Sequence, residues 1–425
     1  MKSLQQIASE LQGYDPHALR ADAVNDFLAR LVEPVQDTET IGIFEALDRV
    51  LAEDLISPLS VPAHDNSAMD GYAFAGTALQ PGAALTLRVV GTALAGSAWG
   101  GTLAEGECLK IMTGAVMPHG LDTVVPFELA QVEDQQVTIA ADTLRAGANR
   151  RRRGEDLLAG QPALRAGERL GPAALGLIAS LGLARVTVRR RLRVAYCSTG
   201  DEILSLGEAP RAGAVYDSNR YTLFGLLTRL GIEVIDLGVV ADEPAALEAA
   251  LRRAAREADA VITSGGVSTG EADHTRAVLS RCGEVAFWRV AMRPGRPLAV
   301  GRLRQDGRDA LLFGLPGNPV AAMVTFLAFV RPALLRLMGA REAAPLPVPA
   351  RCLERLRKRP GRTEYQRGIA SRATDGELQV RSTGHQGSGV LRSMAEANCL
   401  IVLDHEQGDV AAGERVELLL FDGLI

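Results

Sequence analysis

Segment 261–275 carries the residues of this chain that point most directly to chemistry. It reads Val-Ile-Thr-Ser-Gly-Gly-Val-Ser-Thr-Gly-Glu-Ala-Asp-His-Thr, a β-branched run followed by paired glycines, hydroxyl residues and a carboxylate. Glycines let backbone N–H groups turn toward an anion without interference from a Cβ. A nucleotide P-loop is excluded, because Glu271 stands where that motif requires lysine. The alternatives are a tight turn without ligand and a phosphate-binding loop formed by Ser264, Gly265, Gly266 and Ser268.

Carboxylates follow three successive runs that are predicted to be strands. Glu202, Asp242 and Asp273 each come shortly after such a run. In open α/β sheets ligands bind beyond the carboxyl ends of the strands, so these side chains are expected at one rim. Carboxylate oxygens suit a hard divalent cation such as Mg²⁺. The sequence therefore indicates a divalent metal at this rim, beside an anion site.

Arginines occur in two motifs that suit an oxyanion. Arg293 and Arg296 lie on a short loop with two prolines, and Arg150–Arg153 is a run of four arginines that precedes Gly-Glu-Asp. A guanidinium fork binds tetrahedral oxyanions in bidentate fashion, each charged hydrogen bond contributing about 1.5–3 kcal/mol. For the run of four, a salt-bridged surface loop is the alternative interpretation.

A further polar cluster lies earlier in the chain. Asp65–Tyr72 contains two carboxylates, an amide and a hydroxyl beside a Gly-Tyr turn, and an apolar run ends abruptly at Thr113. Asp and Asn favour turns in any case, so a plain turn competes with a binding site here. The six histidines are scattered, and no Ser-His-Asp or Cys-His arrangement follows from spacing.

Several elements must position these residues. Helical spacing is predicted for 22–32, 43–51 and 170–183, and short β-like runs with glycine punctuation fill the stretch from about 58 to 150. From residue 192 strands alternate with helices, which predicts right-handed βαβ units and a parallel sheet. A proline-rich linker at 343–350 precedes alternating runs that suggest a small all-β domain.

Composition narrows the class of protein. The chain has 425 residues, of which 47% are hydrophobic and 23% charged, so it is a globular protein of several domains. A net charge of −5 argues against a general nucleic-acid binder. Five dispersed cysteines without a Cys-x-x-Cys motif indicate a reducing compartment, and a cytoplasmic protein is expected. Segment 311–330 is long enough for a membrane span but is interrupted by Gly-Leu-Pro-Gly-Asn-Pro, so a buried strand, a turn and a core helix are expected instead.

Taken in order, the motifs resemble the molybdopterin molybdenumtransferase family, which comprises the bacterial MoeA proteins and the E domain of gephyrin. The resemblance covers nearly the whole chain and is carried by Asp65–Tyr72, Thr113, Arg151–Asp156, Ser198–Glu202, Tyr216–Arg220, Ser264–Thr275, Gly314–Pro319 and His385–Gly389. It implies a homodimer with four domains per subunit. These are an N-terminal helical or mixed domain at 1–57 and 156–190, a β-rich insertion domain at 58–155, an α/β molybdopterin-binding domain at 191–340 and a C-terminal β domain at 341–425.

The resemblance implies the last step of molybdenum cofactor synthesis. Adenylylated molybdopterin would be bound, AMP released with the help of Mg²⁺, and molybdate inserted. The implied catalytic residues are Asp70, Thr113, Asp156, Glu202, Asp242 and Asp273, of which Glu202, Asp242 and Asp273 would also bind the metal. The implied binding residues for the pterin and the oxyanion are Ser264, Gly265, Gly266, Ser268, Arg151, Arg289, Arg293, Arg296, Pro316, Pro319, Arg367 and Ser388.

Two departures and two alternatives accompany this interpretation. The family usually has lysines where this chain has Arg293 and Arg296, and arginine keeps the charge but cannot act as a neutral amine. His274 stands where tyrosine is commoner. The alternatives are a non-catalytic cofactor carrier or scaffold and a molybdopterin adenylyltransferase, which would consume ATP. The adenylyltransferase of the preceding step is an expected partner, whereas nucleic acid and membrane are not.

Overall fold

The computed structural model describes residues 2–266, 272–341 and 345–425, and the side chains of 272–274 lie outside the description. Ser268 and the side chain of Asp273 therefore fall outside the described residues. Contacts divide the chain into two units. Unit one contains Met1–Ala52, Gly167–Gly171 and Val186–Ile425, and unit two contains Glu53–Ala166 and Pro172–Arg185. The boundaries predicted for four domains stay a prediction.

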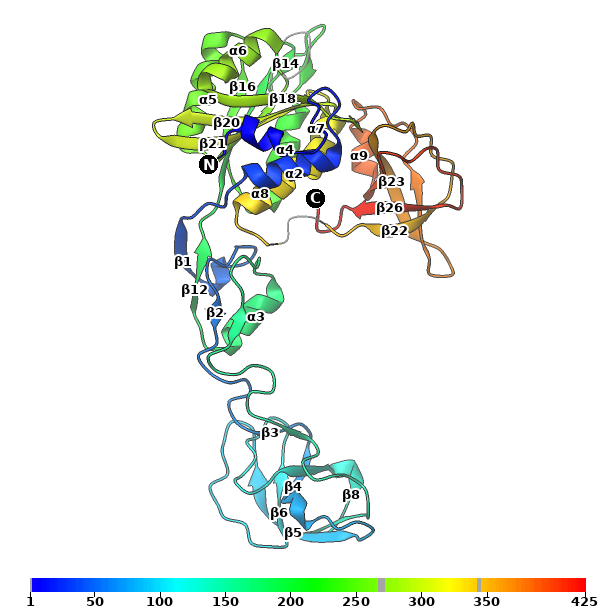
Figure 1. The fold of residues 1–425 in the computed structure, drawn as a ribbon. Coiled ribbons are helices and arrows are strands. Elements are labelled where there is room, and N and C mark those ends of the chain that lie inside the picture. The colour runs from blue at the N-terminus through cyan, green and yellow to red at the C-terminus, as the bar shows by residue number, and fades with distance from the viewer. Residues whose placement is uncertain (1, 267–271, 342–344) are drawn as a thin grey trace. The chain divides into compact units, whose positions relative to one another are not determined.

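A six-stranded sheet forms the centre of unit one (Figure 1). Its order is β16 (Glu233–Val240), β13 (Arg193–Thr199), β17 (Ala260–Ser264), β21 (Arg308–Leu315), β20 (Pro297–Gln305) and β18 (Gly283–Arg289). The first four strands pair in parallel, which confirms the predicted α/β class. The last two pair antiparallel, so the sheet is mixed.

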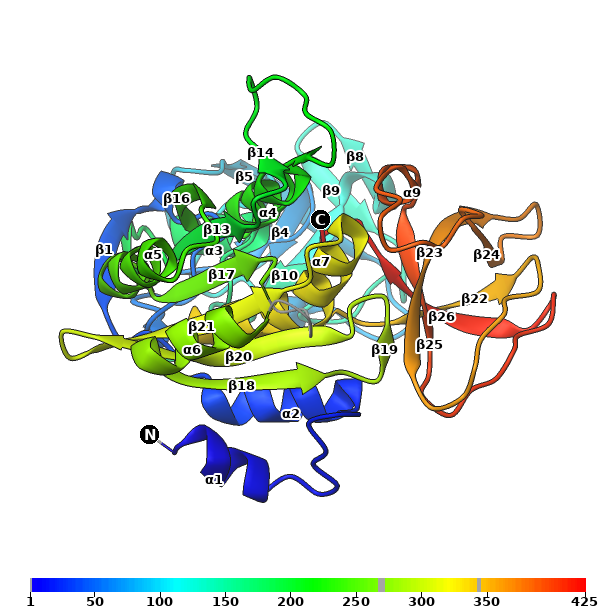
Figure 2. The same cartoon turned by 90° about the horizontal axis from the view of Figure 1, so that it is seen from above.

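Helices cover both faces of this sheet (Figure 2). Alternate residues point to opposite faces of a strand. Accordingly, Tyr196 belongs to the core cluster that contains residues of α2 (Ala21–Leu31), α4 (Ser218–Arg229), α7 (Pro319–Thr325) and α8 (Arg331–Leu337). Its neighbour Cys197 belongs to the cluster with residues of α5 (Pro244–Glu257) and α6 (Ala272–Cys282). The strands are buried on both faces, and their carboxyl ends remain available for a site.

The long apolar segment is part of this core. A π-helical turn, Phe326–Val330, joins α7 to α8. The combined helix Pro319–Leu337 is long and apolar enough for a membrane span. However, 83% of its most apolar stretch is buried inside the protein. The predicted strand, turn and core helix are therefore confirmed by β21, the turn that follows it and α7.

The N-terminal prediction is only partly correct. The helix predicted at 22–32 is α2, and α1 (Leu4–Ser9) precedes it. The helix predicted at 43–51 is wrong, because only a short 3-10 turn, Ile43–Glu45, forms there after β1 (Thr38–Gly42). Asp48 has a φ of 62°, which ends any helical path, and Val50 and Leu51 form isolated β-bridges instead.

A second six-stranded sheet lies in the C-terminal part of unit one. Its order is β19 (Met292–Arg293), β23 (Thr363–Arg372), β24 (Leu378–Ser382), β22 (Val348–Cys352), β26 (Arg415–Leu420) and β25 (Cys399–Leu403), with β25 also pairing with β23. This confirms the predicted C-terminal β domain, which also carries the short helix α9 (Arg392–Glu396). Because β19 belongs to this sheet, the arginine loop is attached to the C-terminal domain.

Unit two is built around a third sheet. Its order is β7 (Thr123–Pro126), β4 (Gly71–Phe74), β6 (Glu107–Ile111), β5 (Leu85–Ala93), β9 (Gln136–Ile139) and β8 (Ala130–Glu133). The predicted β-rich insertion is thus confirmed.

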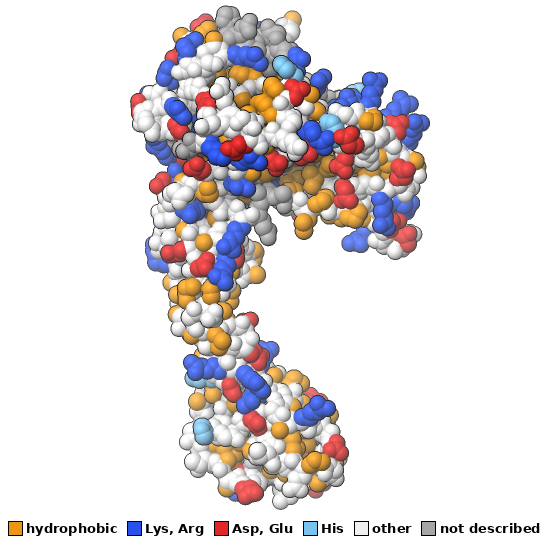
Figure 3. Space-filling view, viewed as in Figure 1, with side chains coloured by type: hydrophobic (Ala, Val, Ile, Leu, Met, Phe, Trp, Pro, Cys, Tyr) orange, Lys and Arg blue, Asp and Glu red, His pale blue; other side chains and the backbone are white. Residues whose placement is uncertain are grey.

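Shorter elements complete the fold. In unit two they are β2 (Leu55–Ile56), β3 (Asn66–Ser67), β10 (Arg150–Arg151), β11 (Pro162–Leu164), α3 (Pro172–Ser180) and the 3-10 turns Gly76–Ala78 and Phe127–Leu129. In unit one β14 (Ile203–Leu204) pairs with β15 (Val215–Tyr216). The strand β12 (Arg185–Arg189) pairs with β1. Charged side chains of both signs are interspersed over the face shown in Figure 3, as the small net charge of −5 leads one to expect.

Candidate functional site

A large cavity of about 1120 Å³ opens in unit one, at the carboxyl ends of the parallel strands. It is lined by residues that follow β13, β16, β17 and β21, by the arginine loop, and by the loop after β24. This is the position that strand topology predicts for a ligand site. Ten of the residues predicted for the site line it: Glu202, Asp242, Ser264, Gly265, Gly266, Arg293, Arg296, Pro316, Pro319 and Ser388.

The glycine turn after β17 has no room for side chains. Gly265 has a φ of +94°, and a Cβ on it would lie 2.5 Å from the carbonyl oxygen of Thr199. Gly266 has a φ of +66°, and its Cβ would lie 3.1 Å from the Thr199 hydroxyl. Both positions therefore require glycine for conformational and steric reasons. A turn without side chains lets a ligand approach its backbone closely, as the predicted phosphate-binding loop requires. The continuation of that loop through Ser268 lies outside the described residues.

Two carboxylates face the cavity from neighbouring strand ends. Glu202 and Asp242 line it and are both solvent-exposed. Within the described part of the chain no three His, Cys, Asp or Glu side chains gather into a metal-binding group. The predicted third ligand, Asp273, has its side chain outside that part. Exposed carboxylate oxygens fit a hard cation that keeps several water ligands, as Mg²⁺ does.

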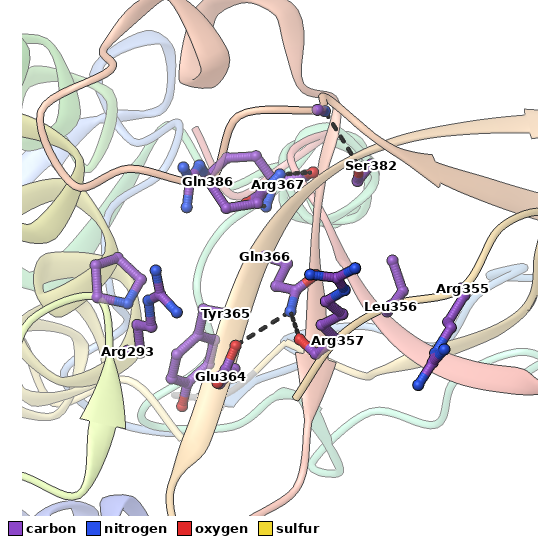
Figure 4. Close-up of a pocket in the computed structure, with 12 residues that line it drawn as sticks. Arg293, Arg355, Leu356, Arg357, Glu364, Tyr365, Gln366, Arg367, Ser382 and Gln386 are labelled. Atoms are coloured by element: carbon purple, nitrogen blue, oxygen red, sulfur yellow. Dashed lines mark hydrogen bonds between the residues drawn. The ribbon is translucent and has the colours of Figure 1, made fainter. Parts of the chain in front are cut away.

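The arginines divide between two adjacent cavities. Arg293 and Arg296 line the large one, and Arg293 also lines a smaller one of about 240 Å³, shown in Figure 4. Arg367 lines the smaller cavity. Arg289 lines neither; it is exposed at the end of β18, where its backbone N–H donates to the Pro16 carbonyl oxygen. Of the arginines that the resemblance assigns to the oxyanion, which are Arg289, Arg293, Arg296 and Arg367, only some are thus brought together.

Arg367 is a buried cation without a carboxylate partner in the described residues. It is 1% exposed, its Nε donates to Ser393 Oγ at 3.1 Å, and its Nη2 donates to the Gly387 carbonyl oxygen at 3.1 Å. Burial and the nearby positive charge of Arg293 lower the pKa of Arg367 to about 10. An anion beside these two guanidiniums would offset the repulsion between them.

Unit two holds a separate cluster. Asp70 Oδ1 accepts hydrogen bonds from both the backbone N–H and the hydroxyl of Thr113, each at 2.7 Å. These bonds to the ionised form lower the pKa of Asp70. Thr113, Arg151 and Asp156 line a pocket of about 250 Å³, which Asp70 does not line.

The four-arginine run combines its two interpretations. Arg150 pairs with Asp65 at 3.4 Å, and the backbone N–H of Arg152 donates to Glu155. These two contacts support the interpretation as a salt-bridged surface loop. Arg151 instead lines the pocket of unit two, so one member of the run is placed at a candidate site.

Sequence reasoning missed one part of the large cavity. Asp217 and Asn219 are buried in its wall, but Tyr216–Arg220 contributed only to the family resemblance, and no site role was predicted for either residue. Asp217 is the N-cap of α4, since its side chain accepts from the Arg220 N–H. Its other oxygen accepts from the Ser198 hydroxyl at 2.5 Å. The signal available in the sequence was the density of polar residues at the start of a helix that follows a strand.

Comparisons with known proteins define the class of the fold. Three family profiles match: the MoeA N-terminal region (domains I and II) at 20–182, a probable molybdopterin-binding domain at 195–336, and the MoeA C-terminal region (domain IV) at 349–421. A solved structure of the molybdopterin biosynthesis moeA protein from Pyrococcus horikoshii OT3 superposes with a TM-score of 0.79 at 25% identity. It covers 95% of this chain and 100% of that one. The class is therefore that of multidomain proteins with a molybdopterin-binding α/β domain.

Two curated relatives narrow the family. The molybdopterin molybdenumtransferase of Haemophilus influenzae is 42% identical over 95% of this chain and 98% of its own length. The enzyme of the same name from a Nostoc species is 36% identical over 96% and 95%. The chain belongs to the MoeA family of molybdenum cofactor biosynthesis. The resemblance found in the sequence and the expected class of enzyme, a transferase, are thereby confirmed.

Proposed function

We propose that the chain inserts molybdate into adenylylated molybdopterin and releases AMP. The observation that carries this proposal is the large cavity. It joins a glycine turn that leaves backbone groups accessible, two exposed carboxylates, and two arginines without ion pairs in the described residues. Cleaving a phosphoanhydride requires charge neutralisation and positioning more than a nucleophile. The cavity offers those two functions.

Different groups of residues would bind the phosphate, the oxyanion and the metal. The glycine turn and Ser264 would hold the phosphate side of the substrate, and Pro316 and Pro319 would shape the wall beside it. Arg293, Arg296 and Ser388, with Arg367 behind them, would hold the oxyanion. Mg²⁺, bound by Glu202, Asp242 and Asp273, would neutralise charge on the phosphoanhydride.

Unit two would contribute to the same reaction. We propose that Asp70, Thr113, Asp156 and Arg151 act in it as well, although they belong to a separate unit. A mixture of Asp70→Asn and Glu202→Gln proteins tests whether two subunits share residues. If they do, the mixture should recover up to about a quarter of the wild-type rate, the share of sites with both residues intact. Two variants that stay inactive when mixed would place all these residues in one subunit.

A homodimer is proposed from an exposed apolar surface on α4. Tyr221 and Phe224, three residues apart, are exposed on this helix, and Val215 and Tyr216 of β15 are exposed just before it. A second copy of the chain is the proposed occupant. Phe224→Lys should shift sedimentation toward the monomer, and an unchanged dimer would rule this surface out.

Five free buried cysteines agree with the proposed cytoplasmic location.

The proposed function is tested by measuring the release of AMP. Purified protein is supplied with adenylylated molybdopterin, Mg²⁺ and molybdate, and AMP is measured by chromatography. Molybdate-dependent AMP release with formation of active cofactor is expected. Binding without AMP release would favour the carrier alternative, and consumption of ATP with pyrophosphate release would favour an adenylyltransferase. The names of the relatives favour the transferase over both alternatives.

The adenylyltransferase of the preceding step is the proposed partner, which would supply the substrate.

A further inference from the structure

The start of α4 joins three neighbouring strand ends of the central sheet. At the end of β13, the Ser198 hydroxyl donates to Asp217 at 2.5 Å. At the end of β17, Ser264 Oγ accepts from Asn219 Nδ2 at 2.6 Å. In the turn after β21, the Gly317 carbonyl oxygen accepts from the same Nδ2 at 2.8 Å. One short segment therefore holds the ends of three strands that are adjacent in the sheet.

The amide of Asn219 can take only one orientation. Both hydrogens of Nδ2 are engaged, and a flipped amide would place Oδ1 against the Gly317 carbonyl oxygen, which is also an acceptor. Oδ1 itself is buried and finds no donor among the described residues. A buried polar atom without a partner is costly, so such a group in a native protein needs an explanation. The explanation here is that the geometry of the Nδ2 bonds is retained at the expense of stability.

Asn219 connects Ser264, the residue that immediately precedes the glycine turn, to the turn after β21, and these residues line the cavity wall. A Cβ on Gly317 would lie 3.9 Å from the Gly265 Cα, so the turn after β21 approaches the glycine turn after β17. Both turns line the large cavity, and Asn219 lines it between them. The backbone N–H of Gly265 donates to the Leu315 carbonyl oxygen at 3.2 Å, and Asn219 adds a side-chain connection beyond that bond, from Ser264 to Gly317.

We infer that Asn219 is a positioning residue. It fixes the distance between the glycine turn after β17 and the turn after β21, Pro316–Pro319, and thereby sets the affinity for the pterin substrate. This inference rests on the proposed assignment of the cavity to that substrate. Its effect should be confined to the pterin, because Arg293 lies on β19 of the C-terminal sheet, and Asn219 bonds neither Arg293 nor Arg296, which directly precedes β20.

The experiment compares Asn219→Ala and Asn219→Asp with the wild type. Loss of two hydrogen bonds should raise KM for adenylylated molybdopterin by about tenfold to a hundredfold, while KM for molybdate stays within about twofold. Asn219→Asp should be at least as severe, because an oxygen then faces the Gly317 carbonyl oxygen. Asn398→Asp is the matched control, since Asn398 Nδ2 bonds the Ala370 carbonyl oxygen far along the chain, in the C-terminal sheet. Its kinetic constants should not change.

A merely structural role would give a different result. It would lower the melting temperature and the active fraction, and so kcat, with KM unchanged. A parallel increase in both KM values would also overturn the inference. Direct titration of adenylylated molybdopterin separates this inference from the proposed function, because it needs no turnover. If the wild type binds the pterin but releases no AMP, weaker binding by Asn219→Ala still supports the positioning role, and equal binding refutes it.

Discussion

Replacement of Arg293 by glutamine tests the oxyanion site most sharply. Arg293 is shared by the two cavities and has no carboxylate partner in the described residues, so its charge is available to a ligand. A charged hydrogen bond contributes about 1.5–3 kcal/mol, which corresponds to about 10- to 150-fold in affinity. Because Arg293 is solvent-exposed, we expect the lower end, an increase of about tenfold in KM for molybdate.

The assay measures molybdate-dependent AMP release at saturating pterin. Arg355→Gln is the matched control, because Arg355 lines the same small cavity but pairs with Asp409 at 2.6 Å and is 69% exposed. Its KM for molybdate should stay within about twofold. The increase for Arg293→Gln should also shrink at high salt. Equal effects of the two substitutions, or no effect of Arg293→Gln, would refute the assignment of the anion to this position.

Three other predictions follow from the geometry. Glu202→Gln should raise the Mg²⁺ concentration needed for half-maximal AMP release by about tenfold, whereas Asp201→Asn, which lies outside the cavity, should not. Thr113→Val removes one bond to the ionised form of Asp70, so the pKa of Asp70 should rise toward its ordinary value. The stability that this carboxylate contributes is present above its ordinary pKa and is lost as pH falls from there through its folded pKa. With the folded pKa raised, the variant has less of this stability to lose, and the loss should be complete at a higher pH than in the wild type; carboxyl chemical shifts measure the pKa of Asp70. Phe313→Ala should destabilise unit one by about 3–5 kcal/mol in urea unfolding, since Phe313 is fully buried.

The central sheet shows which part of a fold periodicity reveals. Alternating strands and helices predicted the parallel strands β13, β16 and β17, because βαβ units leave a clear rhythm. The strand β20 was missed, since no helix separates it from β21. Its signal is the turn at Asp306-Gly307, where both residues have positive φ as a tight hairpin requires. The mixed character of the sheet could therefore have been found from two residues.

The error at 43–51 has a different cause. Apolar residues recur there at helical spacing, but they do not face a common core. Phe44 is 98% exposed, whereas Val50 and Leu51 are buried through bridges to residues more than 100 positions later. Long-range pairing overrides local spacing in such a segment, and no local pattern could have revealed it.

Side chains at strand ends were predictable, and those set by tertiary packing were not. Glu202, Asp242 and Ser264 were placed correctly at the rim because topology alone brings strand ends together. Arg289 also ends a strand, and β18 runs in the same direction as β21, but β18 is the edge strand and the antiparallel strand β20 lies between it and β21, so Arg289 is laterally displaced from the other strand ends. The geometry around Asn219 depends on contacts between three loops, which spacing along the chain cannot show.

The separation of charge in the large cavity follows from how its parts are attached. The carboxylates come from the ends of central-sheet strands, whereas Arg293 lies on β19, which pairs with β23 of the C-terminal sheet. Arg296 lies between β19 and the central-sheet strand β20, and neither arginine forms an ion pair in the described residues, so a cation and an oxyanion could both be held in one cavity. The pairing of β19 with β23 is thus as important for the proposed chemistry as the residues themselves.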